Sequence, residues 1–266
     1  MPWEYVKNDV HAYDDIKQMI GMIESKLDDI VYTEDAMYDG EGNLVHVSTG
    51  KFMESDEFEM GKKYLSSAGF VKWISDGIVV PLAGAHLERD PLLEETVVYK
   101  DTGHLGVLEQ DYSLNFSLNW VRNLSSAVIS VYTGSTYLFN MSGVDVTDQP
   151  FSAVQTFRGL ETTLPFINDV GYKADMLRSL LYVLANKERN TFFVGAIREG
   201  DRRTSPEVNV FNKCAAFFPY FDVNGKFQCA VFMNGTELTI DDFIYRYGDY
   251  FVYLTRQKAT DRCFPD

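Results

Sequence analysis

The 266-residue sequence has few cysteines and lacks the cysteine patterns of a metal or redox site. Its three cysteines, Cys214, Cys229 and Cys263, are widely spaced, and no CxxC pair occurs. Structural zinc sites and redox pairs require closely spaced cysteines, so the sequence indicates neither. We expect three unpaired thiols in a reducing compartment.

Long apolar runs and an amino-terminal leader are also missing. No stretch reaches the roughly 18 consecutive apolar residues of a membrane-spanning helix. The first residues, MPWEY, have neither the basic segment nor the apolar segment of a signal peptide. These absences predict a soluble, cytoplasmic protein that has no membrane span.

Common sequence signatures of catalysis and nucleotide binding are absent as well. The chain contains no GxxxxGK[ST] or GxGxxG phosphate-binding loop, no GxSxG elbow and no HExxH zinc motif. The cofactor is therefore unknown from sequence, and no metal ligand set is predicted. Many active sites have no local signature, so whether the protein is an enzyme stays uncertain at this point.

Positive charge is scarce, and the charge is unevenly distributed. The formal net charge is −15, which disfavours nucleic-acid binding because phosphate backbones are bound through clustered Lys and Arg. Residues 1–110 hold 22 Asp and Glu against 9 Lys and Arg, a net of −13, whereas residues 111–266 hold 17 against 15, a net of −2. The first part has all four histidines, and the second has 16 of the 19 phenylalanines. We predict one globular unit, 1–266, with an acidic helical and hairpin part (1–110) and an aromatic, sheet-rich part (111–266).

Hydrophobic periodicity predicts mixed secondary structure in the acidic part. An apolar stripe at 3–4 residue spacing predicts a helix over 13–30, and Asp-Gly and Gly-Asn turn residues predict a hairpin over 37–47. Acidic residues followed by Lys62 and Lys63 predict a second helix over 54–67. Short β-branched runs predict strands at 78–80, where Pro81 would end the strand, and at 95–100.

In the aromatic part most segments are predicted to be strands. The predicted order along the chain is a strand over 114–120, a helix from 120, a strand at 135–140, a helix over 174–187, and strands at 191–197, 207–211, 226–233 and 250–255. Thr239 and Asp242 have the spacing of a helix capping box. The resulting fold class is α+β: a mainly antiparallel sheet in the C-terminal part with packed helices, and an N-terminal helix and hairpin.

The clearest candidate for chemistry is the segment His86-Leu-Glu88-Arg-Asp90. In an extended chain alternate residues project to one side, so an imidazole and two carboxylates would share a face. Such a set can bind a divalent ion or pair a base with the acid that orients it. The alternative is an exposed loop, which the flanking Pro and Gly favour.

Two further groups of titratable residues are candidates. His104 lies among carboxylates, which makes it a candidate acid–base group or an ordinary surface histidine. Arg198, Arg202 and Arg203 beside a glycine turn have the chemistry of a clamp for phosphate or carboxylate, although Glu199 and Asp201 would equally neutralise them.

The aromatic block at 215–221 suggests the last alternative. It is either the core of a sheet or an exposed docking surface. Pro219 favours the second, because proline occurs in edge strands or bulges. The sequence therefore supports two hypotheses. The first is a non-catalytic interaction or assembly protein that binds a protein partner or itself. The alternative is a metal-assisted or acid–base enzyme for a small anionic substrate, using His86, Glu88, Asp90 and His104 with the three arginines.

Overall fold

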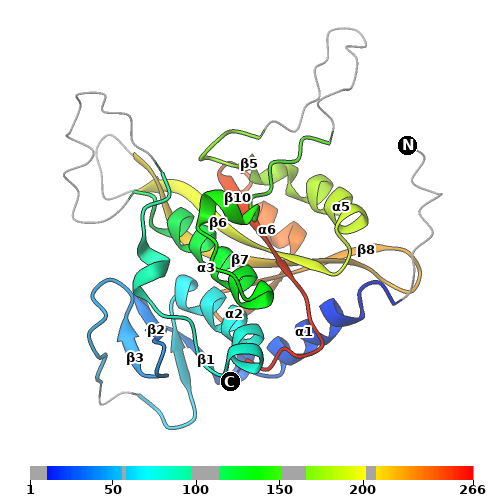
Figure 1. The fold of residues 1–266 in the computed structure, drawn as a ribbon. Coiled ribbons are helices and arrows are strands. Elements are labelled where there is room, and N and C mark those ends of the chain that lie inside the picture. Colours follow the sequence, from blue (N-terminus) through cyan, green and yellow to red (C-terminus); the bar gives the residue numbers. More distant parts are fainter. Residues whose placement is uncertain (1–10, 56–57, 98–113, 151–165, 202–207, 266) are drawn as a thin grey trace, which may run out of the picture.

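The computed structural model describes residues 11–55, 58–97, 114–150, 166–201 and 208–265, the side chains of 201 and 208 excepted. In this part of the chain six α-helices accompany a six-stranded antiparallel sheet (Figure 1). The strands of that sheet are β5 (Tyr172–Lys173), β6 (Thr191–Asp201), β7 (Val208–Phe221), β8 (Phe227–Met233), β9 (Thr236–Thr239) and β10 (Phe251–Lys258). Their order is β5-β10-β6-β7-β8-β9, which confirms the α+β class and the antiparallel sheet.

The central strands are buried on both faces, which explains why they read as nearly continuous apolar runs. Successive residues of β6 alternate between two hydrophobic clusters, with Phe192 and Val194 in one and Phe193 and Ile197 in the other. All four side chains are fully buried. The phenylalanines of β6 and β7 therefore fill the interior on both faces of the sheet, with Phe192 and Phe218 on one side and Phe193 and Phe217 on the other.

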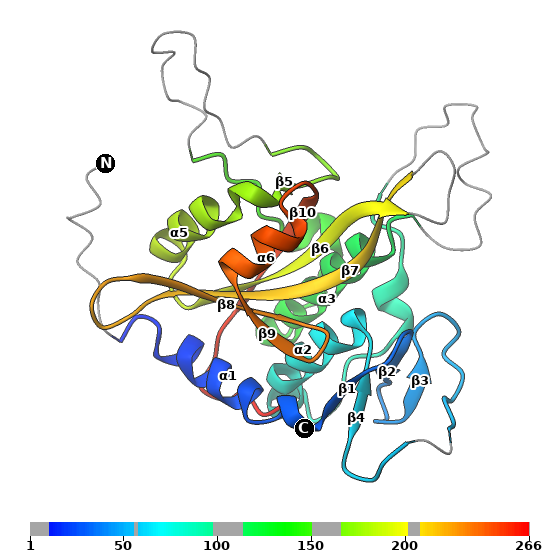
Figure 2. The ribbon, with the colours of Figure 1, turned by 180° about the vertical axis from the view of Figure 1, so that it is seen from behind.

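Helices cover both faces of this sheet. On one face lie α1 (Asp14–Glu24), α2 (Ser67–Ala83) and α3 (Phe116–Thr133), whose apolar residues share one cluster with the sheet. On the other lie α5 (Leu177–Lys187) and α6 (Ile240–Tyr247), seen above the sheet in Figure 2. The first cluster joins residues from both halves of the sequence, so the acidic part contributes α1 and α2 to the same core as the aromatic part.

The acidic part also forms two small sheets beside α2, at the lower left of Figure 1. The predicted hairpin is confirmed: β2 (Ala36–Tyr38) pairs with β3 (Leu44–His46). Next to it, β1 (Ile30–Tyr32) pairs in parallel with β4 (Lys63–Leu65). The remaining short elements are the helix α4 (Phe139–Ser142) and the 3-10 turns η2 (Leu27–Asp29), η3 (Asp90–Leu93) and η5 (Ala174–Met176).

The largest error of the sequence analysis concerns α2. Residues 78–80 were predicted as a strand ended by Pro81, and 54–67 as a helix, but 78–80 belong to the 17-residue α2 and Pro81 lies within it. Residues 63–65 are the strand β4. From Ser67 to Val79 every residue of α2 is buried, so the segment has no exposed face, and periodicity cannot separate a fully buried helix from a buried strand.

Three smaller predictions were also wrong. The strand over 114–120 is absent because α3 begins at Phe116, and 135–140 leads into α4 and forms no strand. Residues 95–97 are not in a strand, and 98–100 lie outside the described residues. For 114–120 burial explains the difference, because most of the first half of α3 is buried against the sheet and α2, and such packing overrides local β propensity. Residues 95–97 and 135–140 are exposed or half-buried and pair with no neighbouring strand.

Other expectations are confirmed. The helix predicted over 13–30 exists as α1 with Ile16, Met19, Ile20 and Ile23 buried, but it ends at Glu24. Thr239 and Asp242 form the predicted capping box at α6. The aromatic block of β7 is core, since Phe217 and Phe218 are fully buried. Pairing of β7 with β6 ends at Phe217, two residues before Pro219, so the proline interrupts no hydrogen bond to β6.

No helix in the described ranges has the length and apolar character needed to cross a membrane.

Candidate functional site

The site is built at the start of α2, where the helix passes very close to β2. Ser66 caps the helix: its hydroxyl accepts from the N–H of Gly69 at 3.1 Å and donates to the carbonyl of Ala36 at 2.9 Å. A Cβ on Gly69 would lie 2.3 Å from that same carbonyl oxygen, so a residue with a side chain does not fit. The cap and the glycine together fix α2 against the hairpin.

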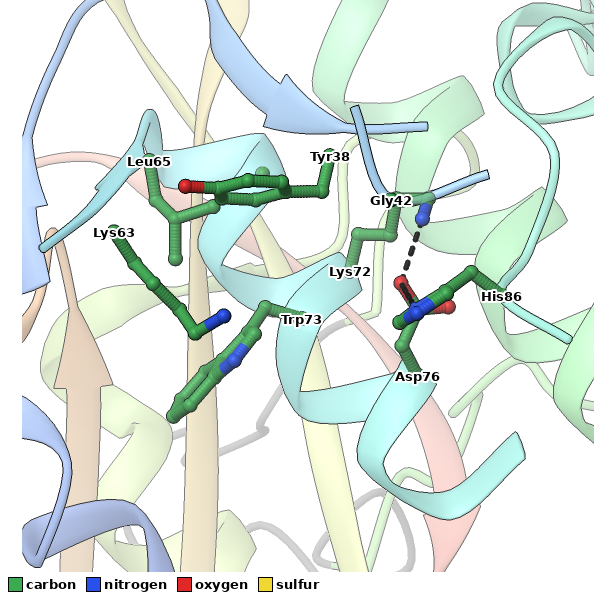
Figure 3. Close-up of a pocket in the computed structure, with 9 residues that line it drawn as sticks. Tyr38, Gly42, Lys63, Leu65, Lys72, Trp73, Asp76 and His86 are labelled. Carbon is green, nitrogen blue, oxygen red and sulfur yellow. Dashed lines mark hydrogen bonds and ion pairs between the residues drawn. The ribbon is translucent and has the colours of Figure 1, made fainter. Parts of the chain in front are cut away.

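A pocket of about 230 Å³ opens between α2, the β2–β3 hairpin and β4 (Figure 3). Helix α2 contributes Gly69, Lys72, Trp73 and Asp76, whose spacing of three and four residues places them on one side of the helix. The other lining residues are Tyr38, Gly42, Lys63, Leu65 and His86. The lining thus combines two aromatic rings, two lysines, a histidine and a single carboxylate.

Asp76 connects the charged residues of this pocket. Its Oδ2 lies 2.6 Å from Nζ of Lys72 and 3.5 Å from Nδ1 of His86. Its Oδ1 accepts the backbone N–H of Leu87 at 2.9 Å. The side chains of Lys72 and Asp76 are 1% and 6% exposed, whereas that of His86 is 32% exposed. One buried carboxylate therefore neutralises the lysine, fixes the segment after α2 and orients the imidazole.

The orientation of His86 has a chemical consequence. When a carboxylate binds one ring nitrogen of a histidine, the other nitrogen is the one that exchanges a proton with a ligand. Here Nδ1 lies 3.5 Å from Asp76, so Nε2 is the ring nitrogen that Asp76 does not contact. An Asp–His pair of this kind is a usual arrangement for general acid–base chemistry.

The other members of the predicted His86-x-Glu88-x-Asp90 set have different neighbours. Glu88 lies against Gly40 of the hairpin turn, where a Cβ would meet its carboxylate at 2.3 Å. Asp90 is highly exposed and pairs with Arg89 at 2.5 Å. Of the three, only His86 lines the pocket, and its acidic partner is Asp76.

The remaining predicted site residues are only partly described. His104, Arg202 and Arg203 lie outside the described residues. Arg198 is in β6 at a register shift between Ile197 and Arg198, and burial lowers the pKa of its guanidinium. The adjacent Glu199 pairs with Lys213 at 2.6 Å, so it neutralises a lysine of β7.

The described part of the chain contains no set of side chains suited to bind a metal ion. No group of three or more His, Cys, Asp or Glu side chains there is placed to hold an ion.

Five of the polar or aromatic residues that line the pocket were not predicted from the sequence: Tyr38, Lys63, Lys72, Trp73 and Asp76. A signal for two of them was present. Lys72 and Asp76 lie four apart within an otherwise apolar run, and on a helix this spacing brings opposite charges together. Each charge buried in a core helix must be compensated by the other, because a single buried charge is strongly destabilising.

A second buried polar centre surrounds Arg122 of α3. Its guanidinium donates to Asp169 at 2.7 Å and to the hydroxyl of Tyr253 at 2.8 Å, and lies between the rings of Phe139 and Tyr253, 4.3 and 4.4 Å from their centroids. Burial raises the pKa of the nearby Asp145 carboxyl. These partners come from four separate segments, so Arg122 joins α3 to the sheet and its loops.

Comparisons of the chain with protein-family models, curated proteins and solved structures give no match. The function must therefore be argued from the pocket.

Proposed function

We propose that the protein binds a small anionic molecule in the pocket and transfers protons on it, with His86 as the acid–base group and Asp76 as the residue that orients it. The observation that carries this proposal is the position of Asp76, a nearly fully buried carboxylate that contacts both Lys72 and His86. Burying a lysine and a carboxylate is costly for stability, and buried charges beside a half-buried histidine in a cleft are typical of functional sites.

The charge of the lining supports an anionic ligand. Lys63 and Lys72 carry two positive charges against the single negative charge of Asp76, in a chain with a net charge of −15. Positive charge in the pocket attracts anions, whereas the acidic surface of the rest of the protein repels them. The volume is below the roughly 300 Å³ at which sites for drug-sized ligands begin, so the molecule must be small.

Self-association and binding of a protein partner stay separate proposals. The feature that suggested them, the aromatic block of β7, is in the core, where Phe217 and Phe218 are inaccessible. The polar residues of the acid–base proposal, by contrast, line an open pocket.

Binding is tested with two neighbouring lysines, one that lines the pocket and one that lies outside it. Lys63 lines the pocket, while Lys62 bonds to the carbonyl of Asp28 outside it. Pyruvate, lactate and inorganic phosphate are titrated at constant ionic strength, with thermal shift and isothermal calorimetry as readouts. We expect Lys63→Gln to weaken binding, while Lys62→Gln, with the same change of charge, leaves it unchanged. Equal effects of the two variants, or no binding by wild type, contradict the proposal.

Proton transfer is tested by exchange of carbon-bound hydrogen of the bound acid with deuterated water, followed by NMR. We expect exchange in the wild type and its loss in His86→Gln, because the glutamine amide cannot take up and release a proton. Undiminished exchange in a folded His86→Gln protein would contradict the role of His86.

A further inference from the structure

Lys72 brings a primary amine to the end of the pocket that Asp76 and His86 occupy (Figure 3). Its side chain is 1% exposed, so the amine is shielded from bulk water but lines the cavity. A shielded lysine beside an acid–base pair is a recurrent arrangement for covalent catalysis through an imine.

We propose that Lys72 forms an imine with a small carbonyl compound that carries a carboxylate or phosphate group. The inference rests on the proposed function, since it uses the same pocket and the same proton-transfer residues. The anionic group is attracted by the positive lining that Lys63 contributes, and the carbonyl carbon is attacked by Nζ of Lys72. Trp73 and Tyr38 supply flat apolar walls for the remaining carbon atoms.

The proton balance of this step uses the observed contacts. Attack requires the free amine, so a proton leaves Nζ for Asp76 Oδ2, which is 2.6 Å away. As the amine attacks, one of its protons moves to the carbonyl oxygen and gives the carbinolamine hydroxyl. His86, which contacts Asp76 Oδ2 at 3.5 Å, supplies in its protonated form the second proton with which that hydroxyl leaves. The new C=N bond forms as the C–O bond breaks, and the oxygen leaves as water. No oxidant or reductant takes part in imine formation.

The test traps the imine chemically in the full-length protein. The protein is incubated with pyruvate and sodium cyanoborohydride, which reduces an imine to a stable secondary amine, and the modified residue is located by peptide mass spectrometry. Alkylation at Lys72 blocks trypsin there, so residues 64–89 are recovered as one modified peptide. We expect the adduct on Lys72, its loss in Lys72→Arg, and its persistence in Lys62→Arg. Because the wild-type map alone locates the adduct, the test holds even if Lys72→Arg does not fold.

Lactate separates this inference from the function on which it rests. Lactate has the size and charge of pyruvate but no carbonyl group to form an imine. If both acids bind and pyruvate leaves no adduct on Lys72, the imine is refuted and the acid–base function stands. If neither binds, the proposed function is refuted too. Labelling spread over exposed lysines, with none on Lys72, also overturns the inference.

Discussion

The backbone N–H of Phe264 donates a hydrogen bond to the carbonyl of Gly77, at 2.8 Å. In a regular helix this carbonyl would accept from residue 81, but residue 81 is Pro81 and has no N–H. The C-terminal segment therefore completes the hydrogen bonding of α2 where the proline interrupts it. Gly77 also permits the approach, because a Cβ there would lie 2.8 to 3.0 Å from atoms of Pro265.

We expect Gly77→Ala to displace the C-terminal segment and expose Cys263, which is 1% accessible in the fold. Burial raises the pKa of the Cys263 thiol to about 12, so it should resist alkylation in the wild type at pH 8. The measurement is the rate of iodoacetamide labelling of each cysteine. Cys214 and Cys229, whose pKa values burial also raises, serve as internal references.

Gly21→Ala is the matched control for this substitution. Gly21 is also inside a helix, but a Cβ there meets nothing within 4 Å. We expect it to stabilise the protein by up to about 1 kcal/mol and to leave Cys263 protected. Equal protection of Cys263 in both alanine variants would show that the segment does not depend on Gly77.

The sequence predicted those elements whose two sides differ in polarity. The helix α1 has a buried stripe and an exposed face, and the hairpin has explicit turn residues, so both were found. By contrast residues 67–79 of α2 are buried on every side. Pro81 wrongly indicated the end of an element, because the hydrogen bond from Phe264 replaces the one that the proline cannot donate. That contact joins residues 187 positions apart and has no local signal.

At the site, the sequence identified one residue of the pocket, His86, but not its partner. His86 was found because titratable residues stand out in a sequence, but its expected partners Glu88 and Asp90 were chosen from neighbouring positions. The actual partner, Asp76, is ten residues earlier and meets His86 only because the chain reverses after α2 at Gly84, which has a positive φ of 73°. Spacing along the chain could not show this.

The ion pair of Lys72 and Asp76 should behave as a coupled unit in stability. Removing one partner leaves a buried charge uncompensated, so Lys72→Met and Asp76→Asn should each cost about 3–5 kcal/mol. The double variant should cost much less than the sum of the two, as measured by urea unfolding in a double-mutant cycle. The exposed pair of Lys17 and Asp14 is the control, for which a coupling below about 1 kcal/mol is expected. Additive losses at 72 and 76 would contradict the coupling.

Gly69→Ala should displace β2 from α2 and so change the shape of the pocket, while α2 itself stays helical. Its methyl group would overlap the carbonyl of Ala36, so β2 and α2 must separate. We expect a loss of about 1–3 kcal/mol from overpacking, together with weaker binding of pyruvate and lactate, because Tyr38 follows Ala36 in β2. The measurements are thermal unfolding and calorimetry. Unchanged binding by Gly69→Ala would show that the distance between β2 and α2 does not set the pocket geometry.

A carboxyl pair at the edge of the large sheet should make stability depend on pH. Burial, the charge of Glu24 and a hydrogen bond with Glu24 raise the pKa of the Glu237 carboxyl. A raised pKa means that the folded state holds the proton more tightly than the unfolded state, so this contribution to stability is present at low pH and is lost as pH rises. We therefore expect Glu237→Gln to increase the melting temperature at pH 7, and to have little effect below about pH 4, where glutamates are protonated in both states.

Glu24→Gln distinguishes the pair from burial alone. If the two carboxyl groups interact, either substitution relieves the repulsion at pH 7, and combining them gives less than the sum of the separate gains. If burial of Glu237 alone were responsible, Glu24→Gln would leave the melting temperature unchanged at both pH values. Melting curves of the two single variants and the double variant at pH 4 and pH 7 separate these outcomes, because only the carboxyl pair predicts a gain from Glu24→Gln that disappears in acid.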